Sequence, residues 1–225
     1  RAFESVRLLA AALRSLLHFL FLRGETAQDL AVAVPTVRRW SLARVPSFLS
    51  PEEVERVLAT ADRTTEHGRR DYAVLLLLAR LGLRAGEVTA LEIGDIHWRA
   101  AEIVVRGKGR EFARLPLLAD VGEALSLHLQ GNRRFSTSRR VFLCKTGPSI
   151  GFTGPSAVSC VVRAALIKAG LRSSRRGAAH LLRHSLATRM IRQGASLAQI
   201  SEVLRHRSLV TTQIYTKVDF ETLRG

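Results

Sequence analysis

Residues 101–117 read AEIVVRGKGREFARLPL, and this stretch decides the fold class. A β-rich run precedes the Gly-Lys-Gly triplet and a second extended run follows it, which is the pattern of an antiparallel hairpin. The sequence on both sides of the hairpin has helical periodicity instead. We therefore predict a mainly α-helical chain that carries a small antiparallel β-sheet, which places it in the α+β class.

Apolar residues at helical spacing predict the helices around the hairpin. SPEEVERVLAT gives the clearest start, because Ser50 suits an N-cap, Pro51 the first helical position and Glu53 the third position of a capping box. The helix expected over 71–81 is apolar almost all round and must be buried. Further helices are expected at about 3–23, 120–130, 155–169, 178–193 and 196–204, with a short strand near 141–143.

The sequence also indicates how the chain is divided. Residues 25–50 contain two prolines and predict a short helical piece followed by a linker. We expect residues 1–45 to be the end of a helical domain plus a linker, and residues 46–225 to be a second, larger domain. Since the chain begins with Arg1 rather than Met and enters helical periodicity at once, we expect a further N-terminal part to precede it.

Composition points to a polyanionic partner and to an intracellular setting. Lys and Arg number 35 against 19 Asp and Glu, which gives a formal charge of +16. Such an excess is typical of nucleic-acid-binding proteins, although an unspecialised basic surface is the alternative.

Cys144 and Cys160 are too few for a disulfide framework and lack CxxC spacing, which favours an intracellular setting. The apolar run at 16–22 is too short to span a membrane, so we expect a soluble, cytoplasmic protein.

The segment HLLRH places His180, Arg183 and His184 on one helical face. The two histidines have the spacing of a zinc pair, but Leu181 stands where a zinc protease needs glutamate, and no clear third ligand follows. A structural role for both histidines is a second interpretation. An arginine beside a histidine also forms a phosphate clamp, and the other segments of the chain favour this interpretation.

Two further segments carry candidate site residues. GLRAGEV places Arg84 after the buried helix and Glu87 in reach of it, either as a helix-capping salt bridge or as part of a site. Lys108 lies between glycines at the hairpin tip, which is either a solvated turn or a place where the backbone approaches a ligand. The tip is not a nucleotide-binding P-loop, because Glu102 and Gly109 occupy positions that the P-loop motif reserves for Gly and for Ser or Thr.

Taken in order, GLRAGE, GKG, HLLRH and LRHRSLVTTQIY resemble the motifs of the tyrosine recombinase (phage integrase) family. The resemblance covers roughly residues 50–220. It implies that residues 1–45 are the C-terminal part of a helical core-binding (SAM-like) domain with its linker, and that residues 46–225 are the catalytic domain. It assigns catalytic roles to Arg84, Lys108, His180, Arg183, His206 and Tyr215, with Glu87 in support.

Two positions depart from the family pattern. Leu181 stands where Asp is common, and Arg205 replaces the Gly that usually precedes the second histidine, His206. Neither departure removes a catalytic group. Arg205 could alter the turn that presents His206.

The resemblance implies attack by Tyr215 on a DNA phosphate to form a 3′-phosphotyrosine and a free 5′-hydroxyl. Two arginines would neutralise the phosphate, His180 would act as the base, Lys108 would protonate the departing oxygen and His206 would hydrogen-bond the phosphate. Because the covalent linkage stores the bond for religation, neither ATP, a metal nor another cofactor is expected.

The implied function is site-specific recombination or integration of double-stranded DNA, as expected for a prokaryotic, phage or mobile-element protein at the nucleoid. The family further implies a homotetramer on two duplexes, with accessory DNA-bending or directionality proteins as possible partners and no membrane partner. Relaxation of DNA by topoisomerase IB-like chemistry is one alternative. A DNA-binding accessory protein with a vestigial site is the other.

Overall fold

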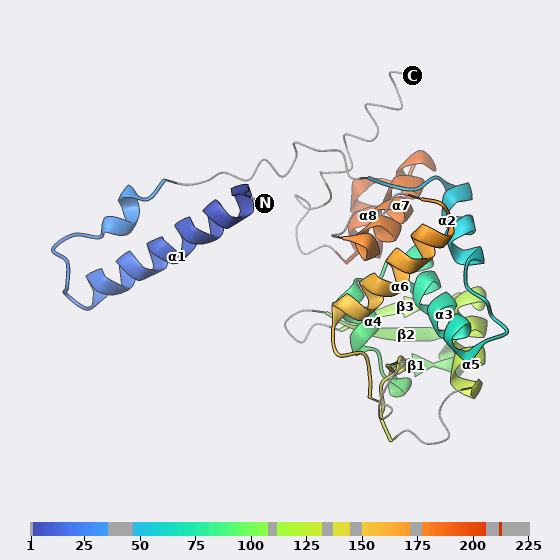
Figure 1. The fold of residues 1–225 in the computed structure, drawn as a ribbon. Coiled ribbons are helices and arrows are strands. Elements are labelled where there is room, and N and C mark those ends of the chain that lie inside the picture. Colours follow the sequence, from blue (N-terminus) through green and yellow to red (C-terminus); the bar gives the residue numbers. More distant parts are fainter. Residues whose placement is uncertain are drawn as a thin grey trace. The chain divides into compact units, whose positions relative to one another are not determined.

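The computed structural model describes residues 2–35, 47–107, 112–131, 137–144, 150–171, 177–205 and 212. The chain divides into two compact units, Arg1–Arg44 and Val45–Gly225, and each is described by itself (Figure 1). Lys108, His206 and Tyr215 lie outside the described residues.

The first unit is built on one long helix. α1 runs over Ala2–Leu22 and confirms the first predicted helix. A 3-10 turn, η1 (Leu30–Ala33), is capped by Asp29, whose carboxylate also pairs with His18 at 2.9 Å. Within the described part of the chain, no helix is both long and apolar enough to cross a membrane. Several apolar side chains of α1 are exposed, among them Val6, Leu8, Leu9, Leu13, Leu16 and Leu22.

The second unit is mostly helical with a small antiparallel sheet, as predicted (Figure 1). Its strands lie in the order β1-β2-β3. β2 and β3 form the predicted hairpin, with Val104 opposite Arg114, and β1 is an additional strand. The elements are α2 (Pro51–Ala59), α3 (Glu66–Arg80), α4 (Ala85–Ala90), η2 (Ile93–Asp95), β1 (Ile96–His97), η3 (Trp98–Ala100), β2 (Glu102–Arg106), β3 (Phe112–Pro116), α5 (Ala119–Gly131), α6 (Pro155–Lys168), α7 (Ala178–Arg192) and α8 (Leu197–Val203).

α3 forms the centre of the core. It contacts α5, α6 and α7, and its run of leucines at 75–78 is fully buried, which confirms that this helix is enclosed. The helix begins at Glu66, earlier than the predicted start at residue 71. The cause is an N-cap, because Thr65 Oγ1 accepts a hydrogen bond from Gly68 N at 3.0 Å and starts a polar first turn that hydrophobic periodicity does not reveal.

The prediction of a strand near 141–143 is wrong. This segment makes only isolated bridges, between Glu92 and Arg140 and between Leu143 and Gly151. Phe142 is buried and stacks on the ring of His128 at a centroid distance of 5.3 Å. The short apolar run therefore reflects a loop whose side chains enter the core, a case that periodicity alone does not separate from a strand.

The capping box that starts α2 is confirmed. Glu53 N donates to Ser50 Oγ at 3.2 Å, and Ser50 N donates to Glu53 Oε2 at 2.9 Å. The preceding residue is held as well, because Leu49 N donates to Ser185 Oγ of α7 at 2.8 Å. The entry of the chain into the second unit is thus fixed both locally and against α7.

Two helical glycines give opposite predictions for the same substitution. A Cβ on Gly68 would lie 1.7 Å from the backbone oxygen of Asp62, whereas a Cβ on Gly122 of α5 would meet only Leu117 side-chain atoms at 3.5 Å or more. We expect Gly68→Ala to lower the free energy of unfolding by about 1–3 kcal/mol. Gly122→Ala should raise it by about 0.5–1 kcal/mol, because alanine is the better helix former. Denaturant unfolding of both variants checks this pair, and a stable Gly68→Ala protein would contradict the close contact.

Candidate active site

The first predicted arginine lies at the start of α4. Arg84 is the N-cap residue, and its backbone N donates to Glu87 Oε2 at 2.8 Å. Arg84 Nη1 donates to the other carboxylate oxygen, Glu87 Oε1, at 2.7 Å. The side chain of Arg84 is 37% exposed while that of Glu87 is 5% exposed. The pair is thus a capping interaction, and it also holds a partly accessible guanidinium in a fixed place.

The second arginine joins two distant turns. Arg183 of α7 is buried, with 3% of its surface exposed. Its Nη1 donates to the carbonyl of Gly82, before α4, and its Nη2 donates to the carbonyl of Leu204, the C-cap of α8. Because both carbonyls are fixed by the ends of helices, the Arg183 guanidinium is held beside the turn that carries Arg84.

Arg205 completes this cluster. Arg84 Nη2 donates to Arg205 O at 2.8 Å, and Arg205 Nη2 donates to Glu87 Oε2 at 2.8 Å. The φ angle of Arg205 is 52°, in the left-handed region that costs a residue with a Cβ about 1–2 kcal/mol. An effect of Arg205 on this turn was expected from the sequence, but the contact of its side chain with Glu87 was not. The available signal was the departure of Arg205 from the glycine that the family resemblance implies at this position.

Glu87 is ionised despite its burial. Burial opposes the charged form, but the positive charges of Arg205 and Arg84 and the hydrogen bond from Arg84 N outweigh it, so the pKa of Glu87 lies below its ordinary value. The carboxylate therefore remains a hydrogen-bond acceptor for both guanidinium groups at neutral pH.

The two histidines of HLLRH lie close together on α7. Their ring centroids are 6.2 Å apart. Partial desolvation, together with the charges of Arg183 and Arg84, lowers the pKa of His180. Burial, His180 and Arg183 lower the pKa of His184 to about 4. Both imidazoles are neutral at pH 7, and His180 is the more exposed of the two.

The structure brings together four of the predicted site residues: Arg84, Glu87, His180 and Arg183. The positions of Lys108, His206 and Tyr215 stay predictions, since these residues lie outside the described ones. Thr212, which belongs to the TTQIY segment, is fully buried. Among the described residues, no group of three or more His, Cys, Asp or Glu side chains is placed to hold a metal ion.

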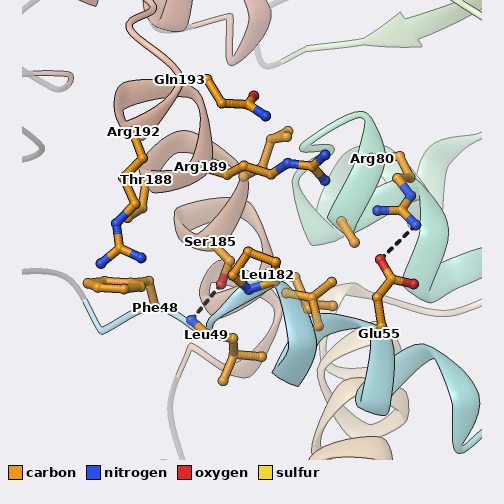
Figure 2. A pocket seen from close by; sticks show the side chains of 14 residues that line it. Phe48, Leu49, Glu55, Arg80, Leu182, Ser185, Thr188, Arg189, Arg192 and Gln193 are labelled. Atoms are coloured by element: carbon orange, nitrogen blue, oxygen red, sulfur yellow. Dashed lines mark hydrogen bonds and ion pairs between the residues drawn. The ribbon is translucent and has the colours of Figure 1, made fainter.

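A pocket of about 420 Å³ lies along a different part of α7 (Figure 2). Phe48 and Arg192 line it, with the Arg192 guanidinium 5.0 Å from the Phe48 ring centroid. The four site residues are not among those that line the pocket. The candidate site is therefore the arginine cluster, which lies outside this cavity.

Comparison with known sequences finds one family for most of the chain. The model of the phage integrase family matches residues 47–222. A putative integrase/recombinase, y4rA of Sinorhizobium fredii, is 49% identical over 97% of this chain and 53% of its own length. The tyrosine recombinase XerC of Bacillus licheniformis is 31% identical over 95% of this chain and 70% of its own. The chain spans about half the length of the first of these curated relatives.

Solved structures share the fold. The XerH site-specific recombinase bound to palindromic difH substrate, a post-cleavage complex, superposes with a TM-score of 0.70 at 26% identity, over 86% of this chain and 56% of that one. The XerA recombinase gives a TM-score of 0.67 at 24% identity, over 93% of this chain and 72% of that one. The second match shows the fold alone.

The close packing around Gly82 predicts the effect of a substitution at this position. Gly82 has a φ of +58°, and a Cβ would lie 2.8 Å from Leu204 Cδ2 and 3.0 Å from Leu186 Cδ2. Gly170 has a similar φ of +71° but no atom within 4 Å of its would-be Cβ. Both alanine variants carry the left-handed cost of about 1–2 kcal/mol. We expect Gly82→Ala to lose at least about 1 kcal/mol more than Gly170→Ala in denaturant unfolding, because the contact also displaces Leu204. Equal losses would show that the turn is not closely packed.

Proposed function

Because the chain belongs to the phage integrase family, we propose that it forms part of a site-specific DNA recombinase that cuts and rejoins strands through a 3′-phosphotyrosine. The observation that carries the proposal is the meeting of Arg84 and Arg183 at the carbonyls of residues 82 and 204–205. These residues come from segments far apart in the sequence. The sequence motifs that carry these two arginines are expected to form one site, and their meeting in space supports this proposal.

Arg84 and Arg183 are proposed to bind the phosphate under attack. A phosphodiester repels a nucleophile, and more negative charge develops in the transition state, so fixed cations lower the barrier. Guanidinium groups suit this role because they stay charged and bind phosphate oxygens with two donors. The contact from Glu87 Oε1 at 2.7 Å orients the Arg84 guanidinium before the DNA arrives.

His180 is proposed to accept the proton of Tyr215. A phenol with a pKa near 10 is only about one part in a thousand ionised at pH 7, so it needs a base or a cationic field. The lowered pKa of His180 keeps its imidazole neutral and able to accept a proton. The same two arginines that lower this pKa also favour the phenolate form of a nearby tyrosine.

Lys108 and His206 complete the proposed mechanism. The departing 5′-oxygen is a poor leaving group as an alkoxide, so it needs a proton from a general acid, and Lys108 is proposed for this role. His206 is proposed to hydrogen-bond the phosphate. No step in this scheme calls for a metal or ATP.

The proposed partner is double-stranded DNA. The formal charge of +16 favours a polyanion, and XerH was solved bound to its difH substrate. We propose that the protein acts as a homotetramer on two duplexes, with accessory DNA-bending or directionality proteins setting the outcome. A protein that recombines chromosomal or mobile-element DNA is proposed to act at the nucleoid in the cytoplasm.

Residues 1–45 are proposed to be the C-terminal part of a core-binding domain and its linker, and residues 46–225 the catalytic domain. The support is that Arg1–Arg44 forms a compact unit of its own. Exposed leucines along α1, such as Leu9 at 70%, suit a helix that packs against further helices of such a domain.

The first test concerns the nucleophile. The substrate is a duplex recovered from a random-sequence library by binding to the full-length Tyr215→Phe protein, referred to below as the selected duplex. The parent should form a covalent adduct with it, seen on a denaturing gel in excess EDTA. Tyr215→Phe should bind with unchanged affinity and form no adduct, because the phenyl ring has no oxygen to attack phosphorus.

Several outcomes would reject the proposal. An adduct of undiminished yield with Tyr215→Phe would remove the nucleophile, and binding without an adduct by the parent would indicate an accessory protein. Relaxation of one supercoiled circle without exchange between paired sites would indicate a topoisomerase.

The second test separates two roles of Lys108. If Lys108 donates a proton to the 5′-oxygen, its loss should matter little when sulfur replaces that oxygen, since a thiol with a pKa of about 8.5 leaves without an acid. We expect Lys108→Ala to cleave ordinary DNA far more slowly than the parent and to approach the parental rate on a 5′-bridging phosphorothioate. Arg183→Ala is the control and should show no rescue, because its charge acts on the non-bridging oxygens. Equal defects of Lys108→Ala on both substrates would transfer the acid role to another residue.

A further inference from the structure

The side chain of Arg205 reaches a buried carboxylate that the proposed mechanism already uses. Its Nη2 lies 2.8 Å from Glu87 Oε2 and also donates to Gly82 O at 3.4 Å. Arg205 is 13% exposed and Glu87 is 5% exposed. Ion pairs on the surface contribute little, whereas a shielded pair fixes the geometry of its members and is costly to break.

The backbone of Arg205 holds a second group. In the left-handed turn after α8, the carbonyl of Arg205 accepts from Arg84 Nη2 and the preceding carbonyl, of Leu204, accepts from Arg183 Nη2. Consecutive carbonyls of one turn therefore hold both of the arginines proposed to bind phosphate. Glycine would adopt this turn at lower cost than arginine, so the backbone alone gives no reason for a side chain here.

The side chain changes the charge available at Arg84. If Glu87 paired with Arg84 alone, its carboxylate would cancel the charge of that guanidinium. Arg205 places a second cation on the same carboxylate, with Oε1 on Arg84 and Oε2 on Arg205. The three side chains together keep one positive charge, and Arg84 is the more exposed of the two arginines, so that charge is offered to an anion at Arg84.

We propose that Arg205 is a positioning residue for strand cleavage: it shares the Glu87 carboxylate with Arg84, fixes the Arg84 guanidinium and leaves its charge to a DNA phosphate. This inference deepens the proposed function and rests on it. Arg205 acts through Arg84 in this proposal, because its Nη2 group is engaged by Glu87 Oε2 and Gly82 O.

The ionisation of Glu87 gives this proposal a separate consequence. Among the described residues, the charged groups that act on Glu87 are Arg205 and Arg84, and Arg183 faces the same Gly82 carbonyl. Burial raises the pKa of Glu87, whereas the charge of Arg205 and the hydrogen bonds and charge of Arg84 lower it. Without Arg205, burial is opposed by Arg84 alone, so the pKa should rise. The carboxylate that holds Arg84 would then be lost at a higher pH as the solution is acidified.

The experiment compares two substitutions in the full-length protein. Arg205→Gly keeps the left-handed turn and removes the charge, whereas Arg205→Lys keeps a charge in the same turn. On the selected duplex, with protein in saturating excess, Arg205→Gly should form the adduct about tenfold more slowly or worse, because a misplaced guanidinium stabilises the transition state poorly. Arg205→Lys should stay within about threefold of the parent, since one nitrogen makes the contact to Glu87.

The pH profile supplies the readout that a merely structural role would not move. The acid limb of the adduct-formation rate should lie at higher pH in Arg205→Gly than in the parent. In a Glu87→Gln background, which has no carboxylate at this position, replacing Arg205 by Gly should not move the limb. A parental rate and profile for Arg205→Gly would overturn the proposal, and so would an Arg205→Lys rate as low as that of Arg205→Gly.

A measurement without DNA separates this inference from the proposed function. NMR titration of the Glu87 carboxyl carbon should show a higher pKa in Arg205→Gly than in the parent. If Glu87 titrated alike in both proteins, the inference would fail even where the parent forms its adduct. If the parent formed no adduct, the proposed function would fail, and a raised pKa would still support the sharing of the carboxylate.

Discussion

Burial of a single carboxylate is the constraint on which the candidate site depends. Glu87 is nearly inaccessible, and its two oxygens accept hydrogen bonds from two guanidinium groups and one backbone N–H. An unpaired charge at such a position would be strongly destabilising, so the two arginines offset the cost of burying the carboxylate. The stability of this region and the geometry of the site therefore depend on the same contacts of Glu87. The turn before α4 and the turn after α8 are brought together because each contributes a partner that the carboxylate needs.

Much of the fold could be predicted from the sequence because its signals are local. The hairpin, the capping box at Ser50 and the buried run of leucines each depend on residues that are neighbours in the chain. The errors have the same origin. The start of α3 depends on a threonine cap in a polar segment, and the segment around Phe142 is apolar because a loop enters the core. Periodicity records burial, and it does not say which backbone conformation achieves that burial.

Arg84, Glu87, His180 and Arg183 lie near one another, but the sequence predicted only part of how they are connected. Arg84 and Glu87 are close in sequence, so their pairing follows from helical spacing. The contact from Arg183 to Gly82 spans 101 positions and that from Arg205 to Glu87 spans 118, whereas that from Arg183 to Leu204 spans 21 and joins α7 to the end of α8. Such contacts are decided by tertiary packing. The sequence shows that Arg205 departs from the glycine of the family pattern. The contact that its side chain makes becomes clear only from the buried Glu87 carboxylate beside it.

The hydrogen bond from Leu49 N to Ser185 Oγ ties the segment before α2 to α7 (Figure 2). Ser185 also donates to Leu181 O within α7, so the chain is anchored directly onto the helix that carries His180 and Arg183. Loss of the Ser185 hydroxyl would therefore remove a hydrogen bond of Leu49 and one of α7 at the same time, two residues from Arg183.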